Sequence, residues 1–442
     1  MEKLLNKRLM DYLIREKLIS QSQFGFQPRK STTDAVTKLV NNLAVNMDGG
    51  KKCVGIFIDL AKAFDTVYTP ILMRNLESMG IRGIPLKLFQ SFLTNRFQQV
   101  KIDEHLSTYQ PITYGVPQGS VLGPSLFLVY LNNLCNYKPF CGKVYSYADD
   151  TALVFTGETW AETQRNAESG LRHTISWLHK NLLTINIKKT KYLTFSKTKK
   201  TQPEPTFSIK AHTCGTEQRT SVGQLQGNRP CNCLTLDRVG DIKYLGVQLD
   251  DALSWKAHIS LLSIRIRKLI WIFKNLRDIL KPQLLKTVYY ALAQSILGYC
   301  ITAWGGACKS IMIKAERAQR SLLKVMFKKP FRYPTTNLYQ DSQVLSVRCL
   351  YILHAILHKH SELIFDPDTQ LKRRSDKVCI VVKHHSVWFT RLLPFLAPHM
   401  YNKINRILNI YDKTIYKCKS IVQKWLLNLN YNEAELLLLT VS

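Results

Sequence analysis

Two adjacent aspartates separate two runs of strand-forming residues in VYSYADDTALVF, residues 144–155. β-branched and aromatic residues flank the pair, so the pattern predicts a hairpin with Asp149 and Asp150 at its tip. Residues 53–59, CVGIFID, have the pattern of a buried strand that ends in the carboxylate of Asp59. The two elements can bring three carboxylates to one edge of a sheet. Taken alone, the aspartate pair also fits an ordinary solvated turn.

So much negative charge in one place is repulsive unless divalent cations neutralise it. Mg²⁺ prefers oxygen ligands and keeps positions for waters and substrate phosphates. Two such ions, about 3.5–4 Å apart, can activate an attacking 3′-hydroxyl and stabilise a departing pyrophosphate. We therefore expect Asp59, Asp149 and Asp150 to be catalytic and metal-binding residues in nucleotidyl transfer, with two Mg²⁺ ions and with Mn²⁺ as the alternative.

The net charge indicates a polyanionic partner. Lys and Arg number 62 against 31 Asp and Glu, which gives the 442-residue chain a formal net charge of +31. A basic protein with solvated lysine faces is the alternative interpretation. The length indicates roughly two to four domains, and an apolar share of 45% allows each to form a core.

The cysteines and the N-terminal residues indicate the cellular compartment of the protein. The scattered cysteines favour a reducing intracellular compartment, and the N-terminal residues alternate like an amphipathic helix, unlike a signal peptide. The uncharged stretch 287–308 is long enough to span a membrane. Its tyrosines, Gln294, Ser295 and glycines favour a buried helix pair instead, so no membrane contact is expected.

The remaining pattern predicts an α+β chain that becomes helical toward its end. Strands are expected at 97–102, 183–195 and 242–249, and helices at 34–47, at 126–134 and after Thr159. Residues 196–240 are rich in Lys, Thr, Gln, Pro and Gly, which indicates a loop or insertion. Almost everything after residue 250 has helical periodicity.

Several motifs occur in an order that is much more specific than any one of them. They are FIDLAKAFDTV, YGVPQGSVLGPSLF, YADD, LTINIKKTKYLTF and KYLGVQLD followed by LSWKAHI. Together they resemble the successive palm and thumb motifs of reverse transcriptases from non-LTR, LINE-type retrotransposons, and most of all the jockey-like elements. QFGFQPRKSTTDAV resembles their fingers motif. The resemblance is specific over roughly residues 1–280 and looser beyond.

The resemblance implies a right-hand polymerase fold with fingers, palm and thumb, an antiparallel palm sheet and a helical C-terminal region. It suggests partial fingers at 1–52, a palm with fingers elements at 53–195 and the insertion at 196–240. Primer grip and thumb would follow at 241–310, and a helical basic region at 311–442. Because the recognisable fingers include Met1, we expect an N-terminally truncated chain that lacks the endonuclease of such elements.

Residue roles follow from the resemblance position by position. Asp59, Asp149 and Asp150 match the metal-binding catalytic triad. Phe64 matches the aromatic gate that excludes a 2′-hydroxyl, although an ordinary core phenylalanine is the alternative. Gln118 and Gly119 match the loop that packs against the incoming nucleotide and template.

Lysines and a turn follow in the later motifs. Lys189 is the candidate lysine near the leaving pyrophosphate, with Lys188 and Lys191 as close rivals. Tyr244, Leu245 and Gly246 match the turn that grips the primer end.

The fingers motif departs from the family pattern. Members usually carry an arginine directly after the second aromatic residue, where this chain has Gln27. Arg29 and Lys30 follow two and three positions later and are the candidates to meet the triphosphate. A reduced nucleotide affinity or a decayed element copy is the alternative.

Basic helices downstream are expected to hold nucleic acid. In residues 255–280 apolar residues alternate with cations that can face a duplex backbone: Lys256, Arg265, Arg267, Lys268, Lys274 and Arg277. Residues 311–335 repeat the pattern and suggest a second contact surface: Lys314, Arg317, Arg320, Lys324, Lys328, Lys329 and Arg332. Solvated helix faces are the alternative for both stretches.

Together these features predict an RNA-directed DNA polymerase that extends a DNA primer on an RNA template with dNTPs. It would work in an intracellular ribonucleoprotein, in the nucleus, the cytoplasm or both. A catalytically dead nucleic-acid-binding remnant is the second hypothesis. An RNA-dependent RNA polymerase is the third, but Phe64 and Tyr-Ala-Asp-Asp argue against it.

Overall fold

The computed structural model describes residues 1–136, 142–212, 233–365 and 379–439. It divides into two compact units, one of residues 1–35 with 52–240 and one of residues 36–51 with 241–442. The predicted insertion 196–240 lies partly outside the described residues.

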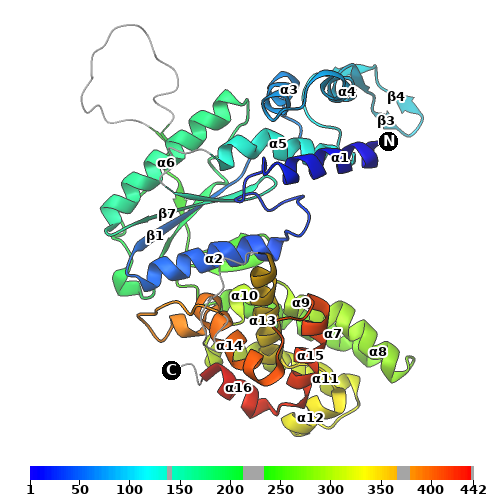
Figure 1. Cartoon of the computed structure of the whole chain (residues 1–442), viewed down its shortest axis with the longest axis vertical. Helices are drawn as coiled ribbons and strands as arrows, with labels where there is room; N and C mark the ends of the chain where they lie inside the picture. The colour runs from blue at the N-terminus through cyan, green and yellow to red at the C-terminus, as the bar shows by residue number, and fades with distance from the viewer. Residues whose placement is uncertain (137–141, 213–232, 366–378, 440–442) are drawn as a thin grey trace. The chain divides into compact units, whose positions relative to one another are not determined.

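The first unit is built on a five-stranded sheet with the order β6-β7-β1-β8-β9 (Figure 1). All pairs are antiparallel except β8 with β9. The strands are β1 (Lys52–Ile58), β6 (Lys143–Tyr147), β7 (Asp150–Gly157), β8 (Lys191–Phe195) and β9 (Asp237–Arg238).

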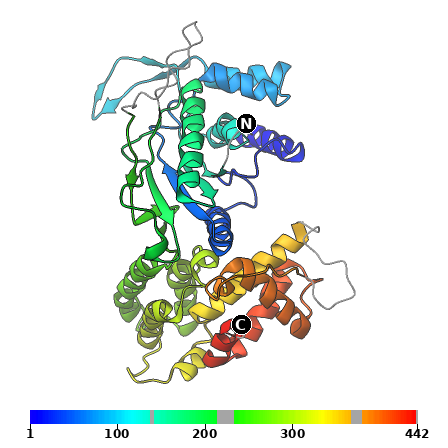
Figure 2. The same cartoon turned by 90° about the vertical axis from the view of Figure 1, so that its left-hand side faces the viewer.

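The central strand β1 is buried on both faces. Val54, Ile56 and Ile58 enter one apolar core, while the alternate residues face the opposite side. The long helix α6 (Trp160–Lys180) packs on β1 and β7 and contributes Leu171 to that core (Figure 2). Burial on both sides explains why the strand reads as an almost continuous apolar run.

A second core of the first unit is formed by helices. These are α1 (Glu2–Arg15), α3 (Thr69–Ser78), α4 (Gly83–Leu93) and α5 (Gly123–Cys135). Nearly all of α5 is buried, which matches its lack of charged residues. Asn132 on α5 fixes the end of the N-terminal helical stretch, because its side chain donates to the Leu18 carbonyl and accepts from the Ser20 N–H, both at 2.8 Å.

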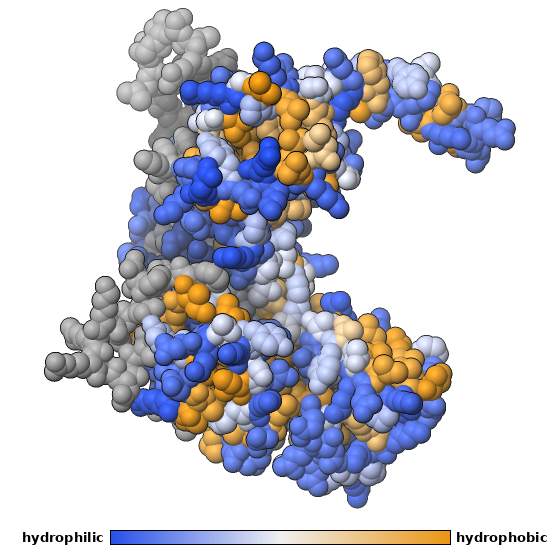
Figure 3. Space-filling model, turned by 45° about the vertical axis from the view of Figure 1, so that its right-hand side comes forward, coloured by the Kyte–Doolittle hydropathy of each residue, from blue (hydrophilic) through white to orange (hydrophobic). Residues whose placement is uncertain are grey.

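The single strand expected at 97–102 is wrong in detail. The chain forms two nested hairpins, in which β2 (Arg96–Gln98) pairs with β5 (Gln110–Ile112) and β3 (Lys101–Ile102) with β4 (His105–Leu106). Apolar and hydrophilic residues alternate along this arm, at the upper right of Figure 3. The break at Gln99 and Val100 interrupts what the sequence presents as one run.

The strand expected at 183–195 is also too long, because only β8 is a strand. Residues before it run irregularly beside the end of β1: the Ala61 N–H donates to the Thr184 carbonyl at 3.0 Å, and Leu60 forms an isolated bridge with Ile185. Leu183 is buried in the helical core. Separate contacts of single apolar side chains therefore produce the alternation of apolar and polar residues that resembles a strand.

The second unit is mainly helical. A short hairpin, β10 (Asp241–Tyr244) with β11 (Val247–Asp250), precedes the helices. They are α7 (Lys256–Leu276), α8 (Pro282–Tyr289), the π-helical turn η2 (Tyr290–Gln294), α9 (Ser295–Gly298), α10 (Ile301–Trp304), α11 (Lys309–Met326), α12 (Thr335–Ser342), α13 (Val347–Phe365), α14 (Leu393–Leu408), α15 (Ile415–Asn428) and α16 (Tyr431–Leu439). The predicted α+β class with a helical C-terminal region is confirmed.

Helix α2 (Thr32–Asp48) is grouped largely with the second unit, although the sequence suggested partial fingers there. Thr37 and Thr302 share a hydrogen bond of 2.6 Å between their hydroxyls. At the other end of the helix, Asp48 accepts from the His385 N–H at 2.8 Å. Contacts distant in sequence thus decide where α2 belongs.

The uncharged stretch 287–308 is divided among α8, η2, α9 and α10. Within the described ranges, none of the helices combines the length and the apolar character needed to cross a bilayer.

Candidate active site

The sheet register of the first unit brings the three predicted carboxylates to one edge. β1 pairs with β7 as far as Ile58 opposite Thr151, so Asp59 and Asp150 occupy the next positions. On its other side Asp150 pairs with Tyr147, which leaves Ala148 and Asp149 as a two-residue turn. The expected hairpin and its relation to the strand of Asp59 are therefore present.

Partial burial and the neighbouring carboxylates both act on Asp150. Partial desolvation, and then the charges of Asp149 and Asp59, hold the pKa of its carboxyl above the ordinary value. Carboxylate oxygens are the donors that Mg²⁺ prefers, so the residues present fit such an ion chemically. The side chains are not already drawn together, since among the described residues no group of three or more His, Cys, Asp or Glu is arranged to hold a metal.

Two of the three rival lysines are distinguished by their partners. Lys189 Nζ lies 4.0 Å from Asp59 Oδ2. Lys191 Nζ instead lies 3.6 Å from Asp237 Oδ2, on the far strand of the sheet. Asp59 also anchors the backbone of this segment, because its carbonyl accepts from the Asn186 N–H at 2.8 Å. Of these two, Lys189 is the one beside the carboxylates.

Phe64 belongs to a stack of aromatic rings. Its ring lies on that of Phe127 with centroids 4.3 Å apart and planes at 24°. The edge of Phe26, from the fingers motif, meets it at 6.3 Å and 87°. Phe127 is fully buried, whereas Phe26 is 45% exposed. The ring of Phe64 is thus supported from below and remains only partly buried.

The loop that carries Gln118 and Gly119 is fixed to the turn after Asp59. The Val116 N–H donates to the Phe64 carbonyl at 3.0 Å, and Gln118 Nε2 donates to Asp65 Oδ1 at 2.7 Å. Gly119 has φ +84°, a conformation that favours glycine. The structure therefore brings the predicted gate and the predicted nucleotide loop together.

Arg96 supports this loop and was not predicted. Its guanidinium donates to the carbonyls of Leu93, Tyr114 and Gly115, and burial lowers its pKa. A single arginine between a helix and a short strand gives no sequence signal for such a role.

In the predicted fingers segment, the side chains of Gln27 and Lys30 contact the backbone of the same segment. Gln27 Nε2 donates to the Gln23 carbonyl at 2.7 Å, and Lys30 Nζ donates to the same carbonyl at 2.9 Å. Lys30 therefore turns back onto its own segment, while Arg29 is exposed with φ +62°. Gln23 itself is fully buried and was also missed by sequence reasoning.

The predicted primer-grip residues form a tight turn in the second unit. Tyr244 pairs with Val247, so Leu245 and Gly246 are the two loop residues, with φ +44° and +80°. Positive φ at both positions is typical of a type I′ hairpin. The Tyr299 hydroxyl donates to the Leu245 carbonyl at 2.7 Å, and its ring leaves little space beside Gly246.

A groove of roughly 840 Å³ lies beside this turn, within the same unit. Gly246, Arg265 and Lys268 line it, as do Lys243 and Tyr299. His258 also lines it, and burial and then Arg265 lower its pKa to about 4, so its ring is neutral at pH 7. Lys256, Arg267 and Lys274 are exposed elsewhere on α7.

Arg277 has an internal role. Its guanidinium donates to the Val325 carbonyl at 3.0 Å near the end of α11. It therefore ties α7 to α11, and α7 packs along α11 over much of its length.

The cations expected at 311–335 also have many internal partners. Lys314 donates to the Ser260 hydroxyl, Lys328 pairs with Asp278 at 2.7 Å and Lys329 pairs with Asp341 at 2.6 Å. Arg320 lies 3.9 Å from the buried Glu316. The pattern of this stretch is thus explained largely by helix packing.

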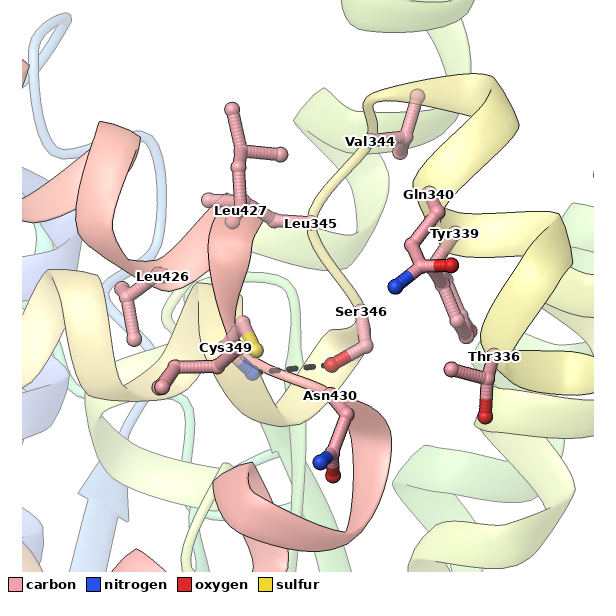
Figure 4. A pocket seen from close by; sticks show the side chains of 11 residues that line it. Thr336, Tyr339, Gln340, Val344, Leu345, Ser346, Cys349, Leu426, Leu427 and Asn430 are labelled. Carbon is pink, nitrogen blue, oxygen red and sulfur yellow. Dashed lines mark hydrogen bonds between the residues drawn. The ribbon is translucent and has the colours of Figure 1, made fainter.

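A small cleft in the second unit is lined by residues of α12, α15 and the segment 344–349 (Figure 4). There Ser346 caps α13 by accepting from the Cys349 N–H at 3.2 Å. Burial raises the pKa of the Cys349 thiol. Nothing in this cleft indicates chemistry.

Comparison with known proteins identifies the family of the chain. The sequence profile described as reverse transcriptase (RNA-dependent DNA polymerase) matches residues 1–249, and the chain belongs to this family. Within it, the chain is of the non-LTR retrotransposon type. It is 26% identical over 403 residues to the probable RNA-directed DNA polymerase from transposon BS of Drosophila melanogaster, covering 89% of this chain and 40% of that protein.

A second relative is the RNA-directed DNA polymerase from mobile element jockey of the same species. It is 27% identical over 361 residues, covering 78% of this chain and 36% of that protein. The chain thus spans about two fifths of the length of these relatives.

Among solved structures, telomerase from Candida albicans in complex with a fragment of telomeric RNA is similar with a TM-score of 0.43 and 12% identity. The similarity covers 96% of this chain and 58% of that one. Apo telomerase from Candida tropicalis gives a TM-score of 0.40 with 10% identity, covering 100% and 61%.

Proposed function

We propose that this chain is an RNA-directed DNA polymerase that adds dNTPs to a primer 3′-end on an RNA template. The observation that carries the proposal is the register of β1 and β7, which sets Asp59 and Asp150 at adjacent positions beside Asp149. The raised pKa of the Asp150 carboxyl, caused by partial desolvation and then by the charges of Asp149 and Asp59, agrees with a site suited to cations. When bound, two divalent ions would supply activation of the primer hydroxyl and charge neutralisation at the phosphates.

The chain's own residues have separate tasks in this proposal. Asp59, Asp149 and Asp150 hold the ions. Lys189, beside Asp59, stabilises the charge of the leaving pyrophosphate. Gln118 and Gly119 contact the incoming nucleotide, with Arg29 as the exposed cation of the fingers segment and Lys30 as a support of its backbone.

Selection of deoxynucleotides falls to Phe64. Its ring cannot move away from the sugar because Phe127 lies behind it. A 2′-hydroxyl would therefore be excluded by contact.

The second unit would bind the primer and template. Tyr244, Leu245 and Gly246 meet the primer end, and Arg265 and Lys268 in the adjacent groove meet phosphates. Lys256, Arg267 and Lys274 add exposed charge on the same helix, whereas Arg277 acts through packing.

Primer extension with the purified chain tests the proposal. Wild type should extend a DNA primer on an RNA template when Mg²⁺ is present, and an Asp149→Asn, Asp150→Asn double variant should not. Asp237→Asn is a matched control, because this exposed carboxylate lies on the outermost strand of the same sheet. Equal product from wild type and the double variant would overturn the proposal.

Two further results separate the alternatives. Binding of an RNA–DNA hybrid without any incorporation would identify a nucleic-acid-binding remnant. Faster incorporation of rNTPs than of dNTPs would identify an RNA-synthesising enzyme.

A further inference from the structure

A short segment of the fingers motif lies along the free edge of the catalytic hairpin. The Phe24 N–H donates to the Ser146 carbonyl at 2.7 Å, and the Ser146 N–H donates to the Ser22 carbonyl at 2.9 Å. Gln23 and Ser146 thereby form a parallel bridge. β6 is the outermost strand on this side of the sheet. The bridge therefore gives this edge strand a backbone partner close to the aspartate turn.

The side chain of Gln23 connects this segment to the turn. It is fully buried. Its Oε1 accepts from the N–H groups of Phe24 at 3.0 Å, Gly25 at 3.1 Å and Ala148 at 3.3 Å. Its Nε2 donates to Ser146 Oγ at 3.2 Å.

Ser146 completes the connection from the other side. Its hydroxyl donates to the Ala148 carbonyl at 3.1 Å and accepts from Thr151 Oγ1 at 3.1 Å as well as from Gln23. Both backbone polar groups of Ala148 are therefore bound through Gln23 and Ser146.

Ala148 needs this support because its φ is +58°. Residues other than glycine rarely adopt such a conformation and keep it only where the surroundings impose it. Asp149 and Asp150 follow directly, so the conformation of Ala148 sets the direction in which both carboxylates leave the turn.

Gly25 packs tightly against the backbone of the aspartate turn. A Cβ atom on Gly25 would lie 2.5 Å from the Ala148 nitrogen and 3.1 Å from the Tyr147 carbonyl carbon. Both are backbone atoms, which cannot yield as a flexible side chain can. The segment and the turn can therefore approach only with glycine at this position.

We propose that Gln23 is a positioning residue of the active site, a role that rests on the proposed polymerase function. Through Ala148 it sets the Asp149 and Asp150 carboxylates relative to Asp59. The carbonyl of Gln23 also holds Gln27 and Lys30, so the same residue couples the basic fingers segment to the metal-binding hairpin. Loss of partners that orient metal ligands typically weakens metal affinity or activity by about 10–100-fold.

The test compares Gln23→Met with Gln319→Met in the full chain. Gln319 is a buried glutamine of the second unit with a similar set of bonds: Nε2 donates to the Tyr289 hydroxyl and the Leu345 carbonyl, and Oε1 accepts from the Tyr339 hydroxyl and the Val347 N–H. Both variants should lower the unfolding temperature. All kinetic measurements are made below the unfolding temperature of each variant.

Only Gln23→Met should change the behaviour of the active site. We expect the half-saturating Mg²⁺ concentration in primer extension to rise roughly tenfold and kcat to fall at least about tenfold. The KM for dNTP should change less than about twofold, because the nucleotide loop at Gln118 is not part of this network. Mn²⁺ titration followed by electron paramagnetic resonance, without nucleotide, should show a matching loss of affinity.

Ser146→Ala provides a second variant should Gln23→Met fold poorly, since it removes the donor to the Ala148 carbonyl and should shift Mg²⁺ dependence in the same direction. Unchanged Mg²⁺ dependence and Mn²⁺ affinity in these variants, with an active wild type, would overturn the role of Gln23 alone. A wild type that neither extends a primer nor binds Mn²⁺ would overturn the proposed function and this role together.

Discussion

The ring of Phe64 is stacked on the ring of Phe127, with centroids 4.3 Å apart and planes at 24°. Phe127 is fully buried on α5, so it forms a fixed support for Phe64 on the turn after β1. The carbonyl of Phe64 in turn accepts from the Val116 N–H, at the start of the loop that carries Gln118 and Gly119. The rings of Phe64 and Phe127 and the loop at Val116 thus pack together.

Replacing Phe64 by a smaller residue should weaken the discrimination against ribonucleotides. In Phe64→Val the space of the ring opens toward the 2′ position, and we expect the ratio of rNTP to dNTP incorporation to rise by at least about tenfold. Single-nucleotide extension with matched rNTP and dNTP measures this ratio. Phe97→Val is the control, because this ring is 62% exposed on the arm. An unchanged ratio would contradict a gate at Phe64.

Removing the charge beside Asp59 should slow the chemical step. We expect Lys189→Met to lower kcat by about 10²-fold, a size typical of losing one positioned charge or acid, with little change in KM for dNTP. Lys191→Met should leave kcat near that of wild type, since Lys191 pairs with Asp237. Pre-steady-state extension distinguishes the two lysines, and equal losses in both variants would argue against the assignment.

The repulsion at Asp150 should appear in the pH dependence of stability. Because the folded-state pKa of this acid is raised, the folded protein binds more protons than the unfolded chain above the ordinary value, and stability falls as pH rises through that window. Without Mg²⁺, Asp150→Asn should therefore stabilise the protein at neutral pH by roughly a few tenths of a kcal/mol, small because exposed charges are screened. The gain should vanish at low pH.

Thermal unfolding of wild type and Asp150→Asn between acidic and neutral pH measures this difference. Addition of Mg²⁺ should stabilise wild type and not the variant. A variant that is less stable than wild type at neutral pH without Mg²⁺ would show that ionised Asp150 does not destabilise the folded protein.

The groove beside the primer-grip turn should control the salt dependence of binding. The double variant Arg265→Gln, Lys268→Gln removes two of its cations, and the slope of log affinity against log salt for an RNA–DNA hybrid should become shallower by roughly 1.5. Fluorescence anisotropy across a salt series gives the slope. Lys419→Gln, Lys424→Gln carries the same charge change on exposed positions of α15 and should leave the slope near that of wild type.

A buried ion pair should hold the helical unit together. Arg348 Nε lies 2.9 Å from Glu435 and 3.6 Å from Glu316, with side-chain exposures of 6%, 7% and 2% respectively. Arg348→Met leaves the carboxylate of Glu435 buried without this cation and leaves Glu316 with Arg320 at 3.9 Å, and we expect a loss of about 3–5 kcal/mol. Arg317→Met on the exposed face of α11 should stay within about 0.5 kcal/mol in denaturant unfolding.

The local sequence is sufficient to predict those helices and strands whose apolar pattern has one physical cause. The β-branched run before Asp59 and the apolar run of α5 are buried on all sides, and such burial leaves an unmistakable apolar signal. Residues 183–190 show the opposite case. Their alternation comes from separate contacts of Leu183 and Ile185, so a strand was expected where none forms.

The family, the order of the motifs and the three candidate carboxylates can be read from the residues alone, because a residue proposed to carry chemistry must have a particular side chain. The three-dimensional fold was needed to show that Gln23 contacts the aspartate turn, that Lys189 rather than Lys191 lies beside Asp59, and that Arg277 binds α11. Those roles depend on partners more than forty residues away, and a hydrogen bond or ion pair between such partners leaves no periodic trace in the chain that makes it.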